Sequence, residues 1–167
     1  ANNTQRVDFL IENLKINSNL LEACIDYPNI KIINLGSSCI YPLDASNPIS
    51  EDDFMTGKLE PTNSPYALAK ITAIELGRSL NIQYGHKVIN LMPTNLYGPN
   101  DNFHPIESHV PAALLRRFHI AKINKHENVE VWGTGKPKRE FMHVYDLTKA
   151  SVFLLQNYSS MSHINVG

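Results

Sequence analysis

Short apolar runs rich in β-branched residues alternate along this chain with longer segments of helical periodicity. The expected strands lie at residues 30–35, 88–92, 129–132 and 164–167, and the expected helices at 7–26, 66–82, 111–123 and 146–157. Residues 42–61 read as a polar surface loop and 95–99 as a turn. Strands that alternate with helices are typical of βαβ units. A parallel sheet built from such units is covered by helices on both faces. The sequence therefore predicts an α/β fold with a doubly wound parallel sheet.

One part of a dinucleotide-binding sheet is missing from the pattern. Such a fold opens with a strand, a G-x-G-x-x-G turn and a helix whose N-terminus receives the pyrophosphate. Here Gly133 and Gly135 form the one closely spaced glycine pair, and they precede Lys136 rather than a helix. We therefore expect a part of a longer polypeptide, a Rossmann-like sheet without its first βαβ unit. Since its edge would be exposed, we expect these residues neither to fold nor to act alone. The alternative is a chain that never bound a dinucleotide.

Charge and cysteine content exclude several kinds of partner. The formal net charge of the 167 residues is −1, and no basic patch suggests a nucleic-acid surface. No apolar run approaches the roughly 20 residues that span a bilayer, and no secretory leader opens the chain. Cys24 and Cys39 make no disulfide framework, so we expect a cytoplasmic protein. We predict no metal site.

Tyr66 and Lys70 are the first candidates for chemistry. They lie four residues apart in an expected helix, so their side chains are neighbours on one face. A nearby ammonium favours phenolate and is expected to lower the tyrosine pKa. The same spacing occurs in two other pairs, Tyr27 with Lys31 and Tyr145 with Lys149. Without further support, each pair reads equally well as surface residues.

A serine-bearing strand end distinguishes the Tyr66 pair from the other two. Gly36-Ser37-Ser38 closes a buried strand one element upstream of Tyr66. Ligands bind at the carboxyl ends of strands in open parallel sheets. A hydroxyl beside the phenol would orient a substrate carbonyl and stabilise negative charge developing on it.

The motifs around these residues resemble a known family. Residues 36–42 (GSSCIYP) and 60–70 (EPTNSPYALAK) resemble the Ser-Tyr-Lys core of extended short-chain dehydrogenases/reductases. Further motifs narrow the resemblance to the GDP-L-fucose synthase family, essentially from end to end. They are residues 92–105 (MPTNLYGPNDNFHP), 108–110 (SHV), 113–119 (ALLRRFH), 131–135 (VWGTG), 139–141 (REF) and 163–167 (HINVG).

The resemblance implies that Ser37, Tyr66 and Lys70 form a reductive triad. Tyr66 would donate a proton to the C4 oxygen as hydride arrives from NADPH. Lys70 would bind the nicotinamide ribose and depress the Tyr66 pKa. Ser37 is preferred to Ser38 because it lies four residues before Tyr41, where the catalytic serine of the family falls.

Cys39 and His109 would carry the second half of the reaction. Inversion beside a ketone needs one group to remove the α-proton and another to reprotonate the opposite face. Thiol and imidazole titrate near the operating pH, which suits both tasks. The resemblance implies that this pair acts at C3 and C5, with Cys39 as the base. The alternatives are a small buried apolar residue for Cys39 and a solvated helix-start residue for His109.

Cofactor and substrate contacts also follow from the resemblance. NADP(H) would contact Leu35, Gly36, Ser37, Ser38, Lys70, Pro93, Thr94, Asn95, Leu96 and His109. The GDP group would contact Arg117, Trp132 and Arg139. Arginine suits a diphosphate through bidentate hydrogen bonds, and tryptophan can pack on the nucleoside. The alternatives are a solvated helix charge for Arg117 and a core aromatic for Trp132.

These inferences define the expected enzyme. Residues 1–100 and 144–167 would belong to the NADP-binding Rossmann domain, and 101–143 mainly to a small GDP-sugar-binding lobe. Helices 7–26 and 66–82 would form a homodimer through a four-helix bundle. The expected reaction is NADPH-dependent epimerisation and C4 reduction of GDP-4-keto-6-deoxy-D-mannose. One alternative is C4 reduction of a related GDP-4-keto deoxysugar or heptose, with or without epimerisation. A second is a non-enzymatic nucleotide-sugar binding module.

Overall fold

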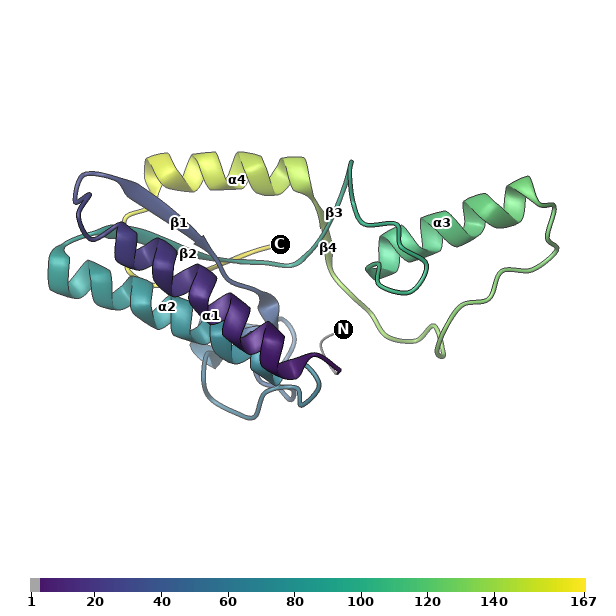
Figure 1. Cartoon of the computed structure of the whole chain (residues 1–167), viewed down its shortest axis with the longest axis horizontal. Helices are drawn as coiled ribbons and strands as arrows, with labels where there is room; N and C mark the ends of the chain where they lie inside the picture. Colours follow the sequence, from purple (N-terminus) through teal and green to yellow (C-terminus); the bar gives the residue numbers. More distant parts are fainter. Residues whose placement is uncertain (1–3) are drawn as a thin grey trace.

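The computed structural model describes residues 4–167 and has the α/β architecture that the sequence predicts (Figure 1). Its main sheet has three strands in the order β1-β2-β5, all parallel. A second sheet consists of β3 and β4. The elements are α1 (Arg6–Ala23), β1 (Lys31–Leu35), η1 (Ser38–Ile40), η2 (Glu51–Asp53), α2 (Ser64–Tyr84), β2 (Lys87–Pro93), β3 (Asn95–Tyr97), α3 (Val110–Ile123), β4 (Phe141–His143), α4 (Val144–Asn157) and β5 (Ile164–Val166).

Helices cover both faces of the main sheet, as a doubly wound fold requires. Figure 1 shows α1 and α2 side by side on one face and α4 on the other. The first face holds a core of Leu21, Ile32, Leu80 and Val88, and the second a core of Ile89, Leu91 and Leu154. Because β2 lies between the two cores, its residues after Lys87 are all buried.

A buried pair of amides joins β1, β2 and α2. The Asn34 Nδ2 donates to the Asn90 Oδ1 at 2.8 Å, and these two residues are also paired in the β1–β2 register. The Asn90 Nδ2 points to the Ile74 carbonyl of α2 at 3.5 Å. Since a one-residue slip would leave both amides unpaired in the core, this pair specifies how β1, β2 and α2 align.

The ends of α2 follow from its sequence. Pro65 stands in the first turn, where its missing N–H costs no helical hydrogen bond. Gly85 ends the helix in the left-handed region, at φ 71°, which glycine adopts without a steric penalty. The helix is longer at each end than the sequence predicts, and it carries Tyr66 and Lys70 in its first two turns.

The second lobe, which is the part of the chain around α3, β3 and β4, departs most from the sequence prediction. Figure 1 shows α3 displaced to one side of the main sheet, joined to it through β3 and β4. Residues 95–97, expected to be a turn, form β3, which pairs in parallel with β4. The prediction of a strand at residues 129–132 is wrong. That segment is irregular, and Val131 and Trp132 are exposed without a neighbouring strand to pair with.

Two smaller corrections concern helix boundaries, and the long loop gains a short helix. Helix α1 ends at Ala23, short of the expected Asp26. Helix α4 begins at Val144, and its cap is His143, whose side chain accepts from the Tyr145 N–H, rather than Asp146. The loop at 42–61 contains the single-turn helix η2, stabilised by a capping box between Ser50 and Asp53.

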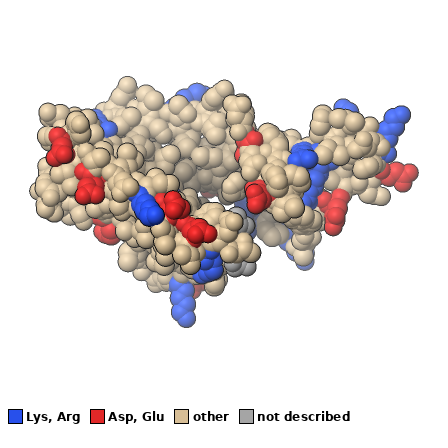
Figure 2. Space-filling view, viewed as in Figure 1, with Lys and Arg blue, Asp and Glu red and all other residues tan. Residues whose placement is uncertain are grey.

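The face drawn in Figure 2 shows no preference for one sign of charge. Acidic and basic side chains are interspersed over the face drawn in Figure 2. Among residues 4–167, no helix is both long enough and apolar enough to cross a bilayer.

Candidate active site

The turn after β1 presents a serine and a cysteine at the carboxyl end of the sheet. The Gly36 N–H donates to the Leu91 carbonyl at 2.8 Å, so the strand pairing continues to the edge of the turn. Ser37 then caps η1, and its Oγ accepts from the Cys39 N–H at 3.4 Å. Ser38 is exposed, whereas Ser37 and Cys39 are half-buried. Ser37 is therefore the serine that faces inward, next to Cys39.

Helix α2 brings Tyr66 and Lys70 to the same place. The Lys70 Nζ donates to the carbonyl of Leu35, the last residue of β1, at 2.8 Å. The same Nζ lies 5.7 Å from the centre of the Tyr66 ring. None of the hydrogen bonds of residues 4–167 uses the Tyr66 hydroxyl. The phenol, the ammonium and the thiol thus gather where β1 ends.

Burial decides the proton affinities of this cluster. Burial raises the pKa of the Tyr66 phenol, and the neighbouring Cys39 thiolate raises it further. The expected lowering of the Tyr66 pKa by Lys70 is therefore wrong. Burial lowers the pKa of Lys70, and the Cys39 thiolate opposes that shift. Burial also raises the pKa of Cys39, against the hydrogen bond from Ser37 and the charge of Lys70. The raised pKa values mean that Tyr66 and Cys39 both bind their protons more tightly than the free side chains do.

The neighbouring β2 end holds the other residues expected at the cofactor. Both the Thr94 Oγ1 and the Asn95 Nδ2 donate to the Glu140 carbonyl, at 2.9 and 3.0 Å, and so tie β2 to the segment before β4. Pro93 ends β2 and Leu96 lies in β3. Gly36 has no room for a side chain, since a Cβ there would lie 2.4 Å from the Met92 Sδ. Because they donate to the Glu140 carbonyl, the side-chain donors of Thr94 and Asn95 are used within the protein.

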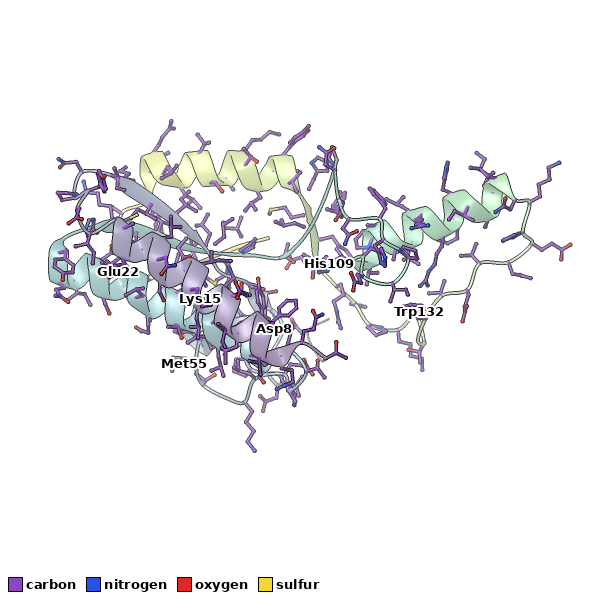
Figure 3. All side chains as sticks on the ribbon, viewed as in Figure 1. Asp8, Lys15, Glu22, Met55, His109 and Trp132 are labelled. Carbon is purple, nitrogen blue, oxygen red and sulfur yellow. The ribbon has the colours of Figure 1, made fainter. Side chains whose placement is uncertain are left out.

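His109 is not joined to this cluster. It is the exposed N-cap residue of α3, and its side chain makes no cap hydrogen bond. Figure 3 places it at the end of α3 nearer the main sheet. Among the described contacts, none links His109 to Cys39, so the two residues expected to share the epimerisation lie on different lobes.

The second lobe brings two of its three expected residues together. The Arg117 guanidinium stacks over the Trp132 ring at 4.0 Å, a cation–π contact. Arg117 also donates to the Glu130 carbonyl at 3.3 Å. The two side chains line an open cavity of about 310 Å³ together with Ile120, Ala121, His126, Asn128, Val129 and Glu130. Trp132 stands on the loop beside α3 (Figure 3) and is 64% exposed, so it is not a core aromatic. Arg139 lies outside this lining and donates to the Lys138 carbonyl.

Sequence reasoning missed a polar group next to the Cys39 turn. The Tyr41 hydroxyl donates to the Asn165 Oδ1 at 2.5 Å and lies 3.2 Å from the His163 Nε2. Glu51 accepts from the Asn165 N–H at 2.8 Å. Each of these contacts joins two residues more than 100 positions apart in the sequence, so no local spacing could have revealed it.

Known proteins match this chain over its whole length. The model of the NAD dependent epimerase/dehydratase family matches residues 1–167. GDP-L-fucose synthase 1 of Arabidopsis thaliana is 54% identical over 167 residues, which cover all of this chain and 52% of the relative. The chain thus spans about half the length of that curated relative.

Two solved structures share the fold closely. A GDP-L-fucose synthetase from Naegleria fowleri bound to NADP has a TM-score of 0.87 at 32% identity, covering 96% of this chain and 52% of that one. A GDP-mannoheptose C4 reductase from Campylobacter jejuni with NADP bound has a TM-score of 0.85 at 34% identity, covering 98% of this chain and 59% of that one.

Proposed function

Because this chain belongs to the NAD dependent epimerase/dehydratase family, we propose that the full-length protein converts GDP-4-keto-6-deoxy-D-mannose to GDP-L-fucose. It does so by epimerisation at C3 and C5 and NADPH-dependent reduction at C4. The observation that carries this proposal is the gathering of Tyr66, Lys70 and Cys39 where β1 ends. Similarity over the whole chain to a GDP-L-fucose synthase supports the choice of substrate.

Tyr66 is the proton donor for the C4 oxygen. Its raised pKa keeps the phenol protonated at neutral pH, as an acid must be before the substrate arrives. Its hydroxyl has no partner in the described part of the chain and is free to meet a carbonyl oxygen. Ser37 supplies a second hydroxyl beside the same oxygen and stabilises the charge that develops there.

NADPH supplies the hydride, and the residues present fit the nicotinamide end of that cofactor. An ammonium has three N–H donors. Lys70 gives one of them to the Leu35 carbonyl, which fixes its position and leaves the others for ribose hydroxyls. Leu35 ends β1, Gly36 and Ser38 follow it, and residues 93–96 lie at the end of the neighbouring strand β2, so the nicotinamide would bind at these two strand ends.

Cys39 and His109 invert the carbons beside the ketone. Cys39 removes the α-proton, and His109 returns a proton to the opposite face. A thiol whose pKa is raised is a stronger base once it is ionised, and the Lys70 ammonium favours that ionisation. His109 reaches the reaction from the second lobe, on the far side of the sugar from Cys39.

The nucleotide end of the substrate lies along the second lobe. Arg117 and Trp132 hold the GDP group in their shared cavity, and Arg139 approaches from the loop that follows. Residues 101–143 are then mainly a substrate-binding segment, between a Rossmann domain of residues 1–100 and 144–167. This division places nucleotide recognition apart from Tyr66, Lys70 and Cys39, whereas His109 belongs to the substrate-binding segment.

A second candidate is reduction at C4 of a GDP-4-keto heptose without epimerisation. The 34% identity to a GDP-mannoheptose C4 reductase over 98% of this chain favours it. The triad of Ser37, Tyr66 and Lys70 serves either reaction, so only the use of Cys39 and His109 separates the two.

Solvent isotope incorporation separates the two candidates. The full-length protein is incubated with GDP-4-keto-6-deoxy-D-mannose in D₂O without NADPH, and the sugar is analysed by NMR. Deuterium at C3 and C5 is expected, followed by NADPH consumption and GDP-L-fucose formation when the cofactor is added. Reduction without deuterium at either carbon would remove the epimerisation and leave C4 reduction alone, the chemistry of the second candidate. Failure of both steps would refute the proposal.

The remaining proposals concern assembly and location. Helices α1 and α2 pack against each other and expose Val7, Ile11, Ile16, Leu20, Leu68 and Ile82, a surface suited to a homodimer. Cys24 and Cys39 are both free thiols, in keeping with a reducing cytoplasm.

A further inference from the structure

A buried polar junction anchors the downstream end of the turn that carries Cys39. Tyr41 is 5% exposed and His163 is 3% exposed. The Tyr41 hydroxyl donates to the Asn165 Oδ1 at 2.5 Å, and the Asn165 Nδ2 donates in turn to the Ile49 carbonyl at 3.3 Å. The junction therefore joins the turn to the strand β5 and to the loop that precedes η2.

The hydrogen bonds of this junction fix the position of each proton. Tyr41 has one proton, and its short bond to Asn165 uses it. The His163 Nε2, at 3.2 Å, must then donate to the Tyr41 oxygen. Burial and the charge of Glu51 raise the pKa of Tyr41 to about 12, so the phenol remains a donor at any physiological pH. The bond from Tyr41 to Asn165 therefore keeps its donor throughout the physiological pH range.

Each end of the Cys39 turn has its own anchor. Upstream, the Gly36 N–H donates to the Leu91 carbonyl at 2.8 Å and ties Ser37 to the sheet. Downstream, the Tyr41 N–H donates to the Ser38 carbonyl at 3.3 Å and closes the turn. The position of this closing hydrogen bond depends on where the Tyr41 side chain is held. Loosening the junction would thus move Cys39 more than Ser37.

We propose that Tyr41 is a positioning residue for Cys39, and that its hydrogen bond to Asn165 holds the thiol beside Tyr66 and Lys70. The catalytic consequence rests on the proposed function, in which Cys39 is the epimerisation base. The placement of the thiol does not rest on it and can be measured without substrate.

The first test measures the reactivity of the thiol. In full-length protein, the rate of Cys39 alkylation by iodoacetamide is followed by peptide mass spectrometry for wild type and Tyr41→Phe. Loss of one hydrogen bond of about 1 kcal/mol corresponds to a rise of about fivefold in the Cys39 rate. Cys24, the C-cap residue of α1, packs against a different core cluster, serves as the internal reference and is expected to keep its rate.

Tyr158→Phe is the matched control, because it removes one phenol hydroxyl that donates to the Ser162 carbonyl at 3.0 Å, away from the turn. It should leave the Cys39 rate unchanged. Asn165→Ala should reproduce the effect of Tyr41→Phe, and the double variant should add nothing further. A Cys39 rate within twofold of wild type in Tyr41→Phe would overturn the proposal. So would a parallel rise at Cys24, or loss of the native circular dichroism signal in both single variants.

The second test separates positioning from catalysis. Tyr41→Phe should lower deuterium incorporation at C3 and C5 about fivefold more than it lowers hydride transfer at C4, because Ser37 keeps its anchor. An equal loss in both steps would overturn the proposal. If wild type incorporates no deuterium, the epimerisation in the proposed function fails, and the alkylation rates alone decide the role of Tyr41.

Discussion

A phenol beside an ammonium is usually expected to lose its proton more easily, and Tyr66 shows why the surroundings must be weighed as well. The spacing of Tyr66 and Lys70 correctly predicted that the two side chains meet. It could not predict the direction of the pKa shift, because burial of the phenol and the thiolate of Cys39 come from other elements. In the free protein, Lys70 mainly binds the end of β1 rather than the phenol.

Replacement of Tyr66 tests its proposed role as the proton donor for the C4 oxygen. Tyr66→Phe keeps the ring and removes the proton donor, so C4 reduction should fall about 10²- to 10⁴-fold, as measured by NADPH oxidation with saturating sugar. Tyr145→Phe is the control, since it also precedes a lysine by four residues but is 61% exposed on α4. Reduction by Tyr66→Phe within tenfold of wild type would contradict the assignment.

His163 makes the folded protein sensitive to acid. Burial and the charge of Arg78 lower the pKa of His163 from 6.5, against the carboxylates of Glu51 and Asp52. Tyr41 donates no proton to it, and its Nδ1 has no partner among residues 4–167. A proton added there would be a buried donor without an acceptor, so the folded state favours the neutral ring.

The pH dependence of stability follows from that preference. Since the folded-state pKa is lowered, the contribution of His163 to stability is complete above about pH 6.5 and is lost as the pH falls through the folded pKa. Between pH 7 and 5, the free energy of unfolding should fall with a slope of at most about 1.4 kcal/mol per pH unit from this one group. Urea unfolding of wild type and His163→Gln measures it. Equal slopes in the two proteins would contradict the prediction.

At the scale of elements, periodicity predicted what local sequence controls. The main helices and the strands β1, β2 and β5 lie where apolar spacing places them, to within a few residues. The errors arose where pairing decides the structure. Residues 129–132 have a strand-like composition but no partner, and residues 95–97 look like a turn but gain one in β4. Neither outcome can be predicted from the residues of the segment alone, because each depends on whether another segment pairs with it.

The amides of Asn34 and Asn90 offer a test at the same scale. Asn34→Ala leaves the Asn90 carbonyl oxygen buried without its donor, which should cost about 1–3 kcal/mol of unfolding free energy. Asn34→Ala with Asn90→Ala should cost less than the sum of the single changes, as measured by urea unfolding.

Asn157→Ala is the control for the amide pair, because its exposed amide bonds only the Phe153 carbonyl of its own helix. It should change stability by no more than about 0.5 kcal/mol. Additive costs for Asn34 and Asn90 would show that the two amides do not act as a pair.

For the whole molecule, the parallel sheet and its cover of helices on both faces were predictable, and the placement of the second lobe was not. The sequence motifs identified Arg117 and Trp132 together, and their side chains do stack. They gave no measure of how far His109 stands from Cys39. That separation depends on the two connections at β3 and β4, whose pairing joins residues more than 40 positions apart.

The proposed dimer is tested on α1. Ile16 and Leu20 lie one turn apart and are 62% and 58% exposed. Changing both to Asp should convert a full-length dimer to a monomer in light scattering after size exclusion, because charged side chains would lose solvation in a helix-bundle interface. Val152→Asp on α4, at a residue that is 50% exposed, should leave the mass unchanged. A dimer that survives the double change would place the interface elsewhere.

The chain leaves the main sheet through β3 and comes back at β4, and these two short strands lie against each other. The segment between β3 and β4 therefore begins and ends at the same place in the fold. The segment between the two strands can therefore be exchanged while Tyr66 and Cys39 stay at the end of β1. Swapping residues 98–140 for their counterpart in a related enzyme would replace His109 together with Arg117 and Trp132, so the nucleotide-sugar contacts and the proposed second acid would change as one unit.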